Sequence, residues 1–402
     1  PRDMNIAMLN GSVFTPERNY SGPGVGVGQQ VYPIGLYGAW YRNYNWNLDT
    51  DETDMGLEEG FRIRLARWEE WFRNNSMEDK TRFLYLIDES SDYNQSQGWA
   101  KTINELEGLG SEVPSMATAD FLNAVREMPD LDITCTTQSF GNTTEWHDAL
   151  KKGEELGMKL WYYNGGHPAH GVTCTEGDAV SFRTIPWAMY KHGIELYFYW
   201  MSTYYNNYQG GEGNFSVFTR AMTFGKYMSD SETMGQDGWM YGNGDGVLLY
   251  PGTDKLFPED DYGAWGPFAS LRMKYWRRGL QDVEYLALAK QKVGEDFVEA
   301  IINETIPRVL WEVGTKKEFP VNSWDIHMST WDDKRLQLGR AIESGHGRMI
   351  RRYDLQLGDP MFDGLDVASL GAHFASRTWQ DGEVEVAAVT VVGSPVVMTI
   401  EA

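Results

Sequence analysis

Short apolar runs alternate with amphipathic stretches through the first 280 residues of the chain. Continuous β-branched or aromatic runs predict strands at 6–9, 83–87, 114–117, 132–135, 159–163, 195–200 and 247–250. Helical periodicity predicts helices at 57–73, 97–108, 121–127, 144–156 and 183–192, with Asp120 as the N-cap of the third. Residues 20–50, which are rich in Gly, Tyr and Asn, predict a loop.

Strands that are apolar on both faces and alternate with helices predict a parallel sheet covered by helices. This number of units favours an α/β fold of the (β/α)8 TIM-like barrel type over a doubly wound sheet. Only about seven strands are visible, so we expect the barrel to be incomplete or irregular at its N-terminal end, with its first units missing or upstream of Pro1.

The pattern changes after the predicted barrel. Residues 281–315 and 331–344 are strongly helical, whereas the sequence from Met349 onward alternates with the period of strands. We therefore predict a barrel domain with a helical extension over 1–315, a helical connector over 316–348, and a C-terminal β-sandwich-like unit over 349–402.

Composition and charge exclude several classes of protein. The 402 residues include 35 Lys and Arg against 58 Asp and Glu, a net charge of −23, which disfavours binding to nucleic acid and to anionic membranes. No segment resembles a membrane-spanning helix, so we expect no membrane insertion. No strand is followed by a dinucleotide motif and no spacing indicates zinc, so we predict no cofactor and no metal. The unusual figure is the 14% of aromatic residues, which include 16 Trp and 22 Tyr.

Seven Asn-x-Ser/Thr sequons indicate an N-glycosylated protein of the extracellular space or cell surface, with coincidence as the alternative. They lie at Asn10, Asn19, Asn74, Asn94, Asn142, Asn214 and Asn303. The chain begins at Pro1 without an initiator Met, so we expect a trimmed product or a fragment. Cys135 and Cys174 follow strands expected to be near one another, so a disulfide is geometrically feasible, and two unpaired buried thiols are the alternative.

The strongest candidate for chemistry is the pair Asp88 and Glu89, which directly follows an apolar strand. Barrel enzymes place catalytic groups at the carboxyl ends of their strands. Neighbouring residues of a regular strand face opposite ways, so both acids can face one pocket only if the strand ends there and the backbone turns. The alternative is a pair of acids that marks a solvated strand end.

Aromatic and polar side chains cluster near other predicted strand ends. The aromatic set, suited to stacking on sugar rings, is Tyr162, Tyr163, Trp200, Tyr204 and Tyr250. For each one alone, packing in the core is the alternative. His167, in a His-Pro-Ala-His sequence, and Asp245, in a Gly-Asn-Gly-Asp-Gly loop, could each supply one polar contact to a pocket, and a tight structural loop is the alternative for Asp245.

Three segments together resemble the catalytic region of glycoside hydrolase family 123 and the related DUF 4091 proteins. They are Gly-Asp-Gly-Val-Leu-Leu-Tyr-Pro-Gly at 244–252, Gly-Pro-Phe-Ala-Ser-Leu-Arg at 266–272, and Arg-Arg-Gly-Leu-Gln-Asp-Val-Glu-Tyr-Leu at 277–286. The strand that ends in Asp88-Glu89 and the Arg183-x-x-Pro-Trp sequence agree with it. The resemblance covers roughly residues 80–290, and the insertion at 253–265 has no counterpart in it.

The resemblance implies a barrel enzyme that cleaves a terminal β-linked N-acetylhexosamine, typically N-acetylgalactosamine, by substrate-assisted catalysis with retention. Glu89 would protonate the leaving oxygen and later activate water, and Asp88 would hold the acetamido N–H. We expect Arg183 to belong to the substrate-binding set. The alternative is a catalytically inactive, glycosylated surface or assembly subunit that uses the barrel as scaffold or carbohydrate-binding module. Its partners would be its own copies or other chains of a surface complex.

Overall fold

The structure is a computed structural model that describes most of the central part of the chain. Its described residues are 31–35, parts of 62–78, 81–89, 91–106, 113–137, 143–175, 177–204, 216–219, 243–253, 256–264, 266–314, 322–347, 350–354 and 397–401. Residue contacts divide the chain into two units. The first comprises 1–281 and 308–326, and the second comprises 282–307 and 327–402.

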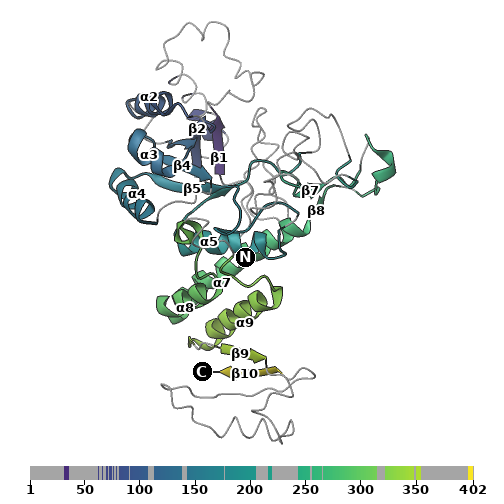
Figure 1. Ribbon diagram of the computed structural model, residues 1–402. Coiled ribbons are helices and arrows are strands. Elements are labelled where there is room, and N and C mark those ends of the chain that lie inside the picture. The colour runs from purple at the N-terminus through teal and green to yellow at the C-terminus, as the bar shows by residue number, and fades with distance from the viewer. Residues whose placement is uncertain are drawn as a thin grey trace, which may run out of the picture. The chain divides into compact units, whose positions relative to one another are not determined.

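A six-stranded parallel sheet forms the centre of the first unit (Figure 1). Each strand pairs with the next one along the chain, from β1 to β6. The strands are β1 (Val31–Gly35), β2 (Thr81–Ile87), β3 (Ser115–Thr118), β4 (Ile133–Thr137), β5 (Lys159–Tyr163) and β6 (Tyr197–Phe198). This order is that of a (β/α) barrel wall, so the α/β class and the parallel sheet are confirmed, whereas closure into eight strands stays a prediction.

Helices connect the strands and cover the sheet. Helices α2 (Tyr93–Asn104), α3 (Phe121–Glu127) and α4 (Thr143–Leu156) lie in one layer beside β2–β5 in Figure 1, and α5 (Ser181–Lys191) precedes β6. The predicted Asp120 cap is confirmed, because its carboxylate accepts the backbone N–H of Asn123 at 3.0 Å. Asp92 caps α2 in the same way, so that helix begins earlier than its apolar periodicity indicates.

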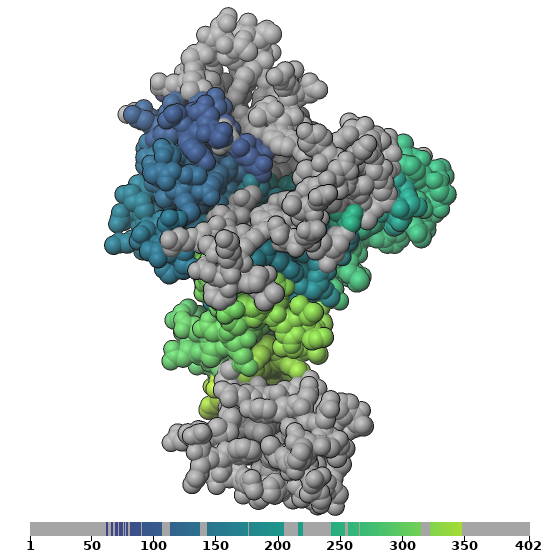
Figure 2. Space-filling model, in the orientation of Figure 1, coloured from purple at the N-terminus to yellow at the C-terminus, as the bar shows by residue number. Residues whose placement is uncertain are grey.

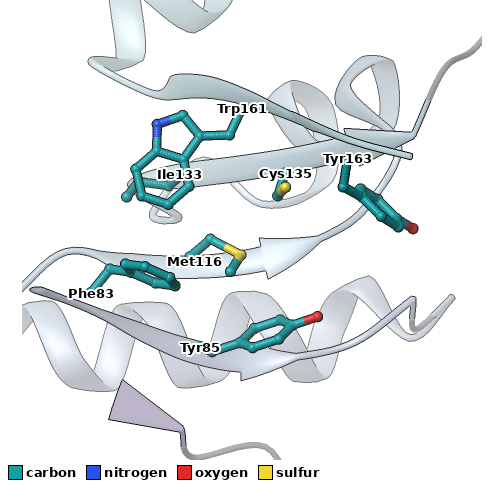
Figure 3. Close-up of a cluster of buried hydrophobic side chains, with 7 residues drawn as sticks. All are labelled: Phe83, Tyr85, Met116, Ile133, Cys135, Trp161 and Tyr163. Carbon is teal, nitrogen blue, oxygen red and sulfur yellow. The ribbon is translucent and has the colours of Figure 1, made fainter. Parts of the chain in front are cut away.

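The opposite face of the sheet carries a cluster of buried side chains, which Figure 3 shows. Its members come from alternate positions of β2–β5: Phe83, Tyr85, Met116, Ile133, Cys135, Trp161 and Tyr163. The rings of Phe83 and Trp161 meet edge to face with centroids 5.0 Å apart. Intervening residues such as Leu84 and Leu86 are equally buried, which explains why β2 is apolar at successive positions.

Three predictions for the first unit need correction. Strand β1 lies inside the segment predicted as a loop, and β6 is shorter than the apolar run that contains it. The run at 247–250 does not continue the parallel sheet: β7 (Leu249–Tyr250) pairs in antiparallel register with β8 (Phe268–Ala269). The connection between β7 and β8 contains the short 3-10 helix η3 (Pro258–Asp260) instead of a crossover helix, so the chain returns beside the strand that it left.

The second unit is helical in its described part. Helix α7 (Leu271–Val293) begins in the first unit and ends in the second, where α8 (Glu295–Thr305) and α9 (Met328–Ser344) follow, while the 3-10 helix η4 (Leu310–Val313) belongs to the first. The buried carboxylate of Asp282 accepts a hydrogen bond from Arg335 Nε at 2.5 Å. No helix in the described residues is both long and apolar enough to cross a membrane.

The C-terminal strands agree in part with the predicted β-unit. Strand β9 (Ile350–Asp354) begins next to the predicted boundary and pairs in antiparallel register with β10 (Val397–Glu401). The remaining predicted strands of this segment lie outside the described residues, so the β-sandwich-like unit and the domain boundaries at 315 and 348 stay predictions.

Candidate active site

Strand β2 ends at Ile87, and the chain turns sharply at the two acids that follow. Glu89 has a φ of 47°, in the left-handed region that a residue other than Gly seldom adopts. Its backbone N–H donates a hydrogen bond to Thr118 Oγ1 at 2.7 Å, which fixes the turn against the end of β3. The condition set by the sequence, a strand that ends and a backbone that turns, is therefore met.

Two buried hydroxyls hold the carboxylate of Asp88. Tyr85 and Thr118 both donate hydrogen bonds to Asp88 Oδ1, each at 2.7 Å. Burial, followed by the charge of Asp88, raises the pKa of Tyr85 well above its ordinary value, so the phenol stays protonated and remains a donor. The Thr118 hydroxyl donates to Asp88 and accepts the N–H of Glu89, and it therefore couples the positions of both acids.

Glu89 is exposed and is held by one tyrosine from across the sheet. Tyr163, the last residue of β5, donates its hydroxyl to Glu89 Oε1 at 2.5 Å. Burial, and then this hydrogen bond, raises the pKa of Tyr163 above its ordinary value. In Figure 3 the hydroxyls of Tyr85 and Tyr163 both point towards the carboxyl ends of the strands. One half-buried and one exposed carboxylate thus lie beside each other at this edge.

Tyr85, Thr118 and Phe198 belong to this site and were missed by the sequence reasoning. The ring of Phe198 meets those of Tyr85 and Tyr163 at centroid distances of 6.2 and 6.5 Å. A signal for Tyr85 was available, because alternation in β2 places it on the same face as Phe83. Thr118 could have been found as the last residue of the neighbouring strand.

A third carboxylate, that of Asp245, is buried and hydrogen bonded. Its Oδ1 accepts from Tyr199 Oη at 2.8 Å and from Trp200 Nε1 and Thr173 Oγ1 at 3.2 Å each. Burial raises the pKa of Asp245, and these hydrogen bonds oppose the rise. Asp245 therefore holds its loop together. These contacts agree best with a structural role, which was the alternative to a contact with substrate.

The glycines on either side of Asp245 are required by the backbone and by close neighbours. Gly244 and Gly246 have φ values of 68° and 76°. A Cβ on Gly244 would lie 2.7 Å from the guanidinium of Arg272, and one on Gly246 would lie 2.6 Å from the Trp200 ring. Arg272 Nη1 donates to the carbonyl oxygens of Thr173 and Gly244 at 2.7 and 2.6 Å. Two of the segments that carry the family resemblance are thus joined by direct contacts.

The model of the glycoside hydrolase 123 catalytic domain matches residues 42–289, which is more than half of the chain. The chain belongs to glycoside hydrolase family 123. The matched range contains the acid pair together with Tyr85, Thr118 and Tyr163, and also Asp245 and its neighbours.

Among solved structures, the chain is similar to a family 123 glycoside hydrolase from Clostridium perfringens, which was studied for the hydrolysis of glycolipid glycans. The identity is 12% and the TM-score 0.39, and the match covers 72% of this chain and 44% of that one. This family 123 chain thus spans less than half the length of that enzyme. No curated protein matches the chain.

The remaining predicted substrate contacts of the family 123 chain fall into separate groups. Trp200 and Tyr204 lie together, with ring centroids 5.0 Å apart, next to Asp245. Tyr250 packs instead with Phe218, at 5.4 Å. Trp200 and Tyr204 are thus grouped with Asp245, and Tyr250 with Phe218.

Tyr162 and Arg183 are fully buried in this family 123 chain. Tyr162 alternates with Tyr163 and faces the other side of the sheet, where its ring lies 6.0 Å from that of His170. Arg183 lies in α5, and a Cβ on Gly279 of α7 would come within 2.6 Å of its carbonyl oxygen. The structure does not bring either residue to Asp88 and Glu89. The close approach of α5 to Gly279 explains why the segment 277–286, which carries part of the family resemblance, has a glycine at this position.

His167 lies in a polar cluster of its own. Its Nε2 is 3.4 Å from Asp178 Oδ2, 3.3 Å from Ser181 Oγ and 3.4 Å from Asn322 Nδ2. Burial lowers the pKa of His167, although Asp178 opposes this. A serine triad would need Ser and Asp on opposite ring nitrogens, so this arrangement is not one. The described residues contain no group of three or more His, Cys, Asp or Glu suited to a metal.

Cys135 and Cys174 are buried thiols that are not joined in a disulfide, which is the second of the two arrangements that the sequence left open. Burial, and then the charge of Asp88, raises the pKa of the Cys135 thiol. The sequon residues Asn74, Asn94 and Asn303 are exposed, and the other four, Asn10, Asn19, Asn142 and Asn214, lie outside the described residues.

Proposed function

We propose that this chain is a retaining glycoside hydrolase that removes a terminal β-linked N-acetylhexosamine, with N-acetylgalactosamine preferred. The observation that carries the proposal is the adjacent pair at the end of β2, in which Asp88 is held by two hydroxyls and Glu89 is exposed. Membership of family 123 supports hydrolysis of a glycosidic bond.

The two acids suit the two tasks of substrate-assisted hydrolysis. In the first step the acetamido oxygen of the sugar attacks the anomeric carbon, the glycosidic C–O bond breaks, and Glu89 gives its proton to the leaving oxygen. Asp88 accepts the acetamido N–H and stabilises the positive charge that develops on the oxazolinium-like ring. In the second step Glu89 takes a proton from water, which opens that ring at the anomeric carbon and gives net retention.

The exposure of Glu89 supports this proposal over the alternative of an inactive surface or assembly subunit. A general acid must reach the oxygen of a bound substrate, whereas a carboxylate kept only for structure has no need of solvent access. The alternative retains its support from the seven sequons. Because of the same sequons, we propose that the protein is extracellular or displayed on a cell surface. To test this, the native protein is digested with an amidase specific for N-glycans, and we expect its mass to decrease.

The test of the function is release of para-nitrophenol from the para-nitrophenyl β-N-acetylgalactosaminide and its gluco epimer. We expect turnover on the galacto epimer, and loss of most of it in Glu89→Gln, which keeps the shape of the side chain but cannot carry the proton. Absence of turnover on both epimers by the folded chain would contradict the proposal.

A further inference from the structure

Four aromatic rings contact one another around the β7–β8 pair, and the proposed reaction uses none of them. We call Phe218, Tyr250, Tyr262 and Phe268 the aromatic platform. Ring centroids are 5.4 Å apart for Phe218 and Tyr250, 4.9 Å for Phe218 and Tyr262, and 5.9 Å for Tyr262 and Phe268. Tyr262 lies in the 253–265 insertion, which has no counterpart in the family resemblance.

Two rings of the aromatic platform face solvent, whereas Phe218 and Tyr250 are partly buried against Val217 and Val247. Tyr262 is 62% exposed and Phe268 is 41% exposed, although both have ring neighbours. Single exposed aromatic residues are ordinary, but a contiguous group of exposed rings is a feature of binding surfaces. The described residues between 216 and 268 have colours between teal and green in Figure 2.

The backbone holds these rings in place before any ligand binds. Tyr250 and Phe268 are directly opposite in the antiparallel pair, so their side chains share one face. The connection between them is closed by the hydrogen bond from the Ala264 N–H to the Gly252 carbonyl at 3.1 Å. A Cβ on Gly252 would lie 2.0 Å from the Gly266 carbonyl oxygen, so the two ends of the connection are in close contact. A rigid platform loses little conformational entropy on binding.

Carboxylates that are close to the rings in the sequence limit the charge of a ligand that could bind there. Glu259 and Asp261 are exposed beside Tyr262 in the sequence, and Asp260 accepts a hydrogen bond from Ser216, two residues before Phe218. These charges repel anionic ligands, and they repel a second copy of a chain whose net charge is −23. Carboxylates accept hydrogen bonds from hydroxyls, and aromatic faces pack on the C–H faces of pyranose rings.

We propose that the aromatic platform binds neutral saccharide units, at a place distinct from the contacts of Asp88 and Glu89. Because the rings of Tyr262 and Phe268 are nearly perpendicular, at 85°, the apolar face of a sugar would lie on Tyr262 and its edge would contact Phe268, with its hydroxyls directed to Glu259 or Asp261. The proposal goes beyond the proposed hydrolysis, because such binding would persist in a chain without turnover.

Binding of triacetylchitotriose to the unglycosylated full chain, measured by titration calorimetry in the Glu89→Gln background, tests this inference. We expect Tyr262→Ala and Phe268→Ala to bind about tenfold more weakly, and Tyr262→Phe to bind as the parent does. Matched controls are Leu256→Ala and Leu271→Ala, which remove side chains that are 57% and 67% exposed, and they should leave affinity unchanged. Sialyllactose, which is anionic, should bind more weakly than the neutral trisaccharide.

Two results would overturn the inference. In the first, Tyr262→Ala and Phe268→Ala bind triacetylchitotriose with an affinity within about twofold of that of the parent, and both variants unfold at the same temperature as the parent. The other is a parent chain that self-associates in light scattering and becomes monomeric in Tyr262→Ala, which would assign the platform to a second copy. Absence of para-nitrophenol release by the parent chain, together with saccharide binding that the alanine variants weaken, would count against the proposed hydrolysis alone.

Discussion

The Thr118 hydroxyl is the contact on which the arrangement of both acids depends, and Thr118→Val removes it at nearly constant volume. The change deletes a 2.7 Å donor to Asp88 Oδ1 and the 2.7 Å acceptor of the Glu89 N–H. A hydrogen bond to a charged group contributes about 1.5–3 kcal/mol. If this energy acts in the transition state, kcat/KM should fall roughly 10- to 100-fold, since about 1.4 kcal/mol corresponds to a factor of ten.

The assay is initial-rate hydrolysis of the para-nitrophenyl β-N-acetylgalactosaminide, with kcat and KM determined separately. Because Asp88 acts on the developing charge, we expect the loss mainly in kcat. Thr118→Ser keeps the hydroxyl and should retain most activity. A kcat/KM for Thr118→Val within about twofold of the parent, in protein that unfolds cooperatively, would refute the reasoning.

Three further changes test other parts of the structure. Tyr163→Phe removes the donor to Glu89 Oε1 and should lower kcat about tenfold in the same assay, while the protein still folds. An unaltered kcat would show that this hydrogen bond is dispensable. In calorimetry, Gly246→Ala should unfold at a lower temperature than Gly263→Ala. Both glycines have a positive φ, but only a Cβ on Gly246 would lie 2.6 Å from an indole carbon. Equal decreases in unfolding temperature would contradict the steric argument. Burial lowers the pKa of His170 to about 4, so this histidine is protonated at a lower pH in the folded state than in the unfolded state. The free energy of unfolding should therefore decrease as the pH drops from about 6.5 to about 4. His170→Gln should unfold with a flatter pH dependence over that window, and an unchanged slope would assign it to other groups.

Much of the sheet could be predicted because its physical signal is local. Strands β2 and β5 are continuous apolar runs, and Asp120 is a capping residue directly before an amphipathic helix. Strand β1 was missed because Val31–Gly35 holds a Pro and a Gly within a polar segment, and its pairing with β2 depends on residues fifty positions away. The antiparallel pairing of β7 likewise depends on β8, which no local pattern indicates.

The sequence indicated the two charged members of the site and Tyr163, which donates to Glu89. Asp88 and Glu89 interrupt an apolar run, so the sequence displays them, and the turn that brings them together is visible only in the backbone. Tyr85 and Thr118 carry the hydrogen bonds to Asp88, yet in sequence they look like ordinary strand residues. Tyr162 and Tyr163 differ by one position and lie on opposite faces, so aromatic clustering could not assign their roles.

Substrate-assisted hydrolysis by the Asp88–Glu89 pair is the central claim, and the reactivity of the substrate's own acetamido group tests it most directly. The measurement is kcat/KM for para-nitrophenyl β-galactosaminides that carry acetyl, monofluoroacetyl, difluoroacetyl and trifluoroacetyl groups on nitrogen. If the carbonyl oxygen is the nucleophile, each added fluorine withdraws electrons from it and the rate should fall steadily along the series. A rate that stays level from acetyl to trifluoroacetyl would contradict the account.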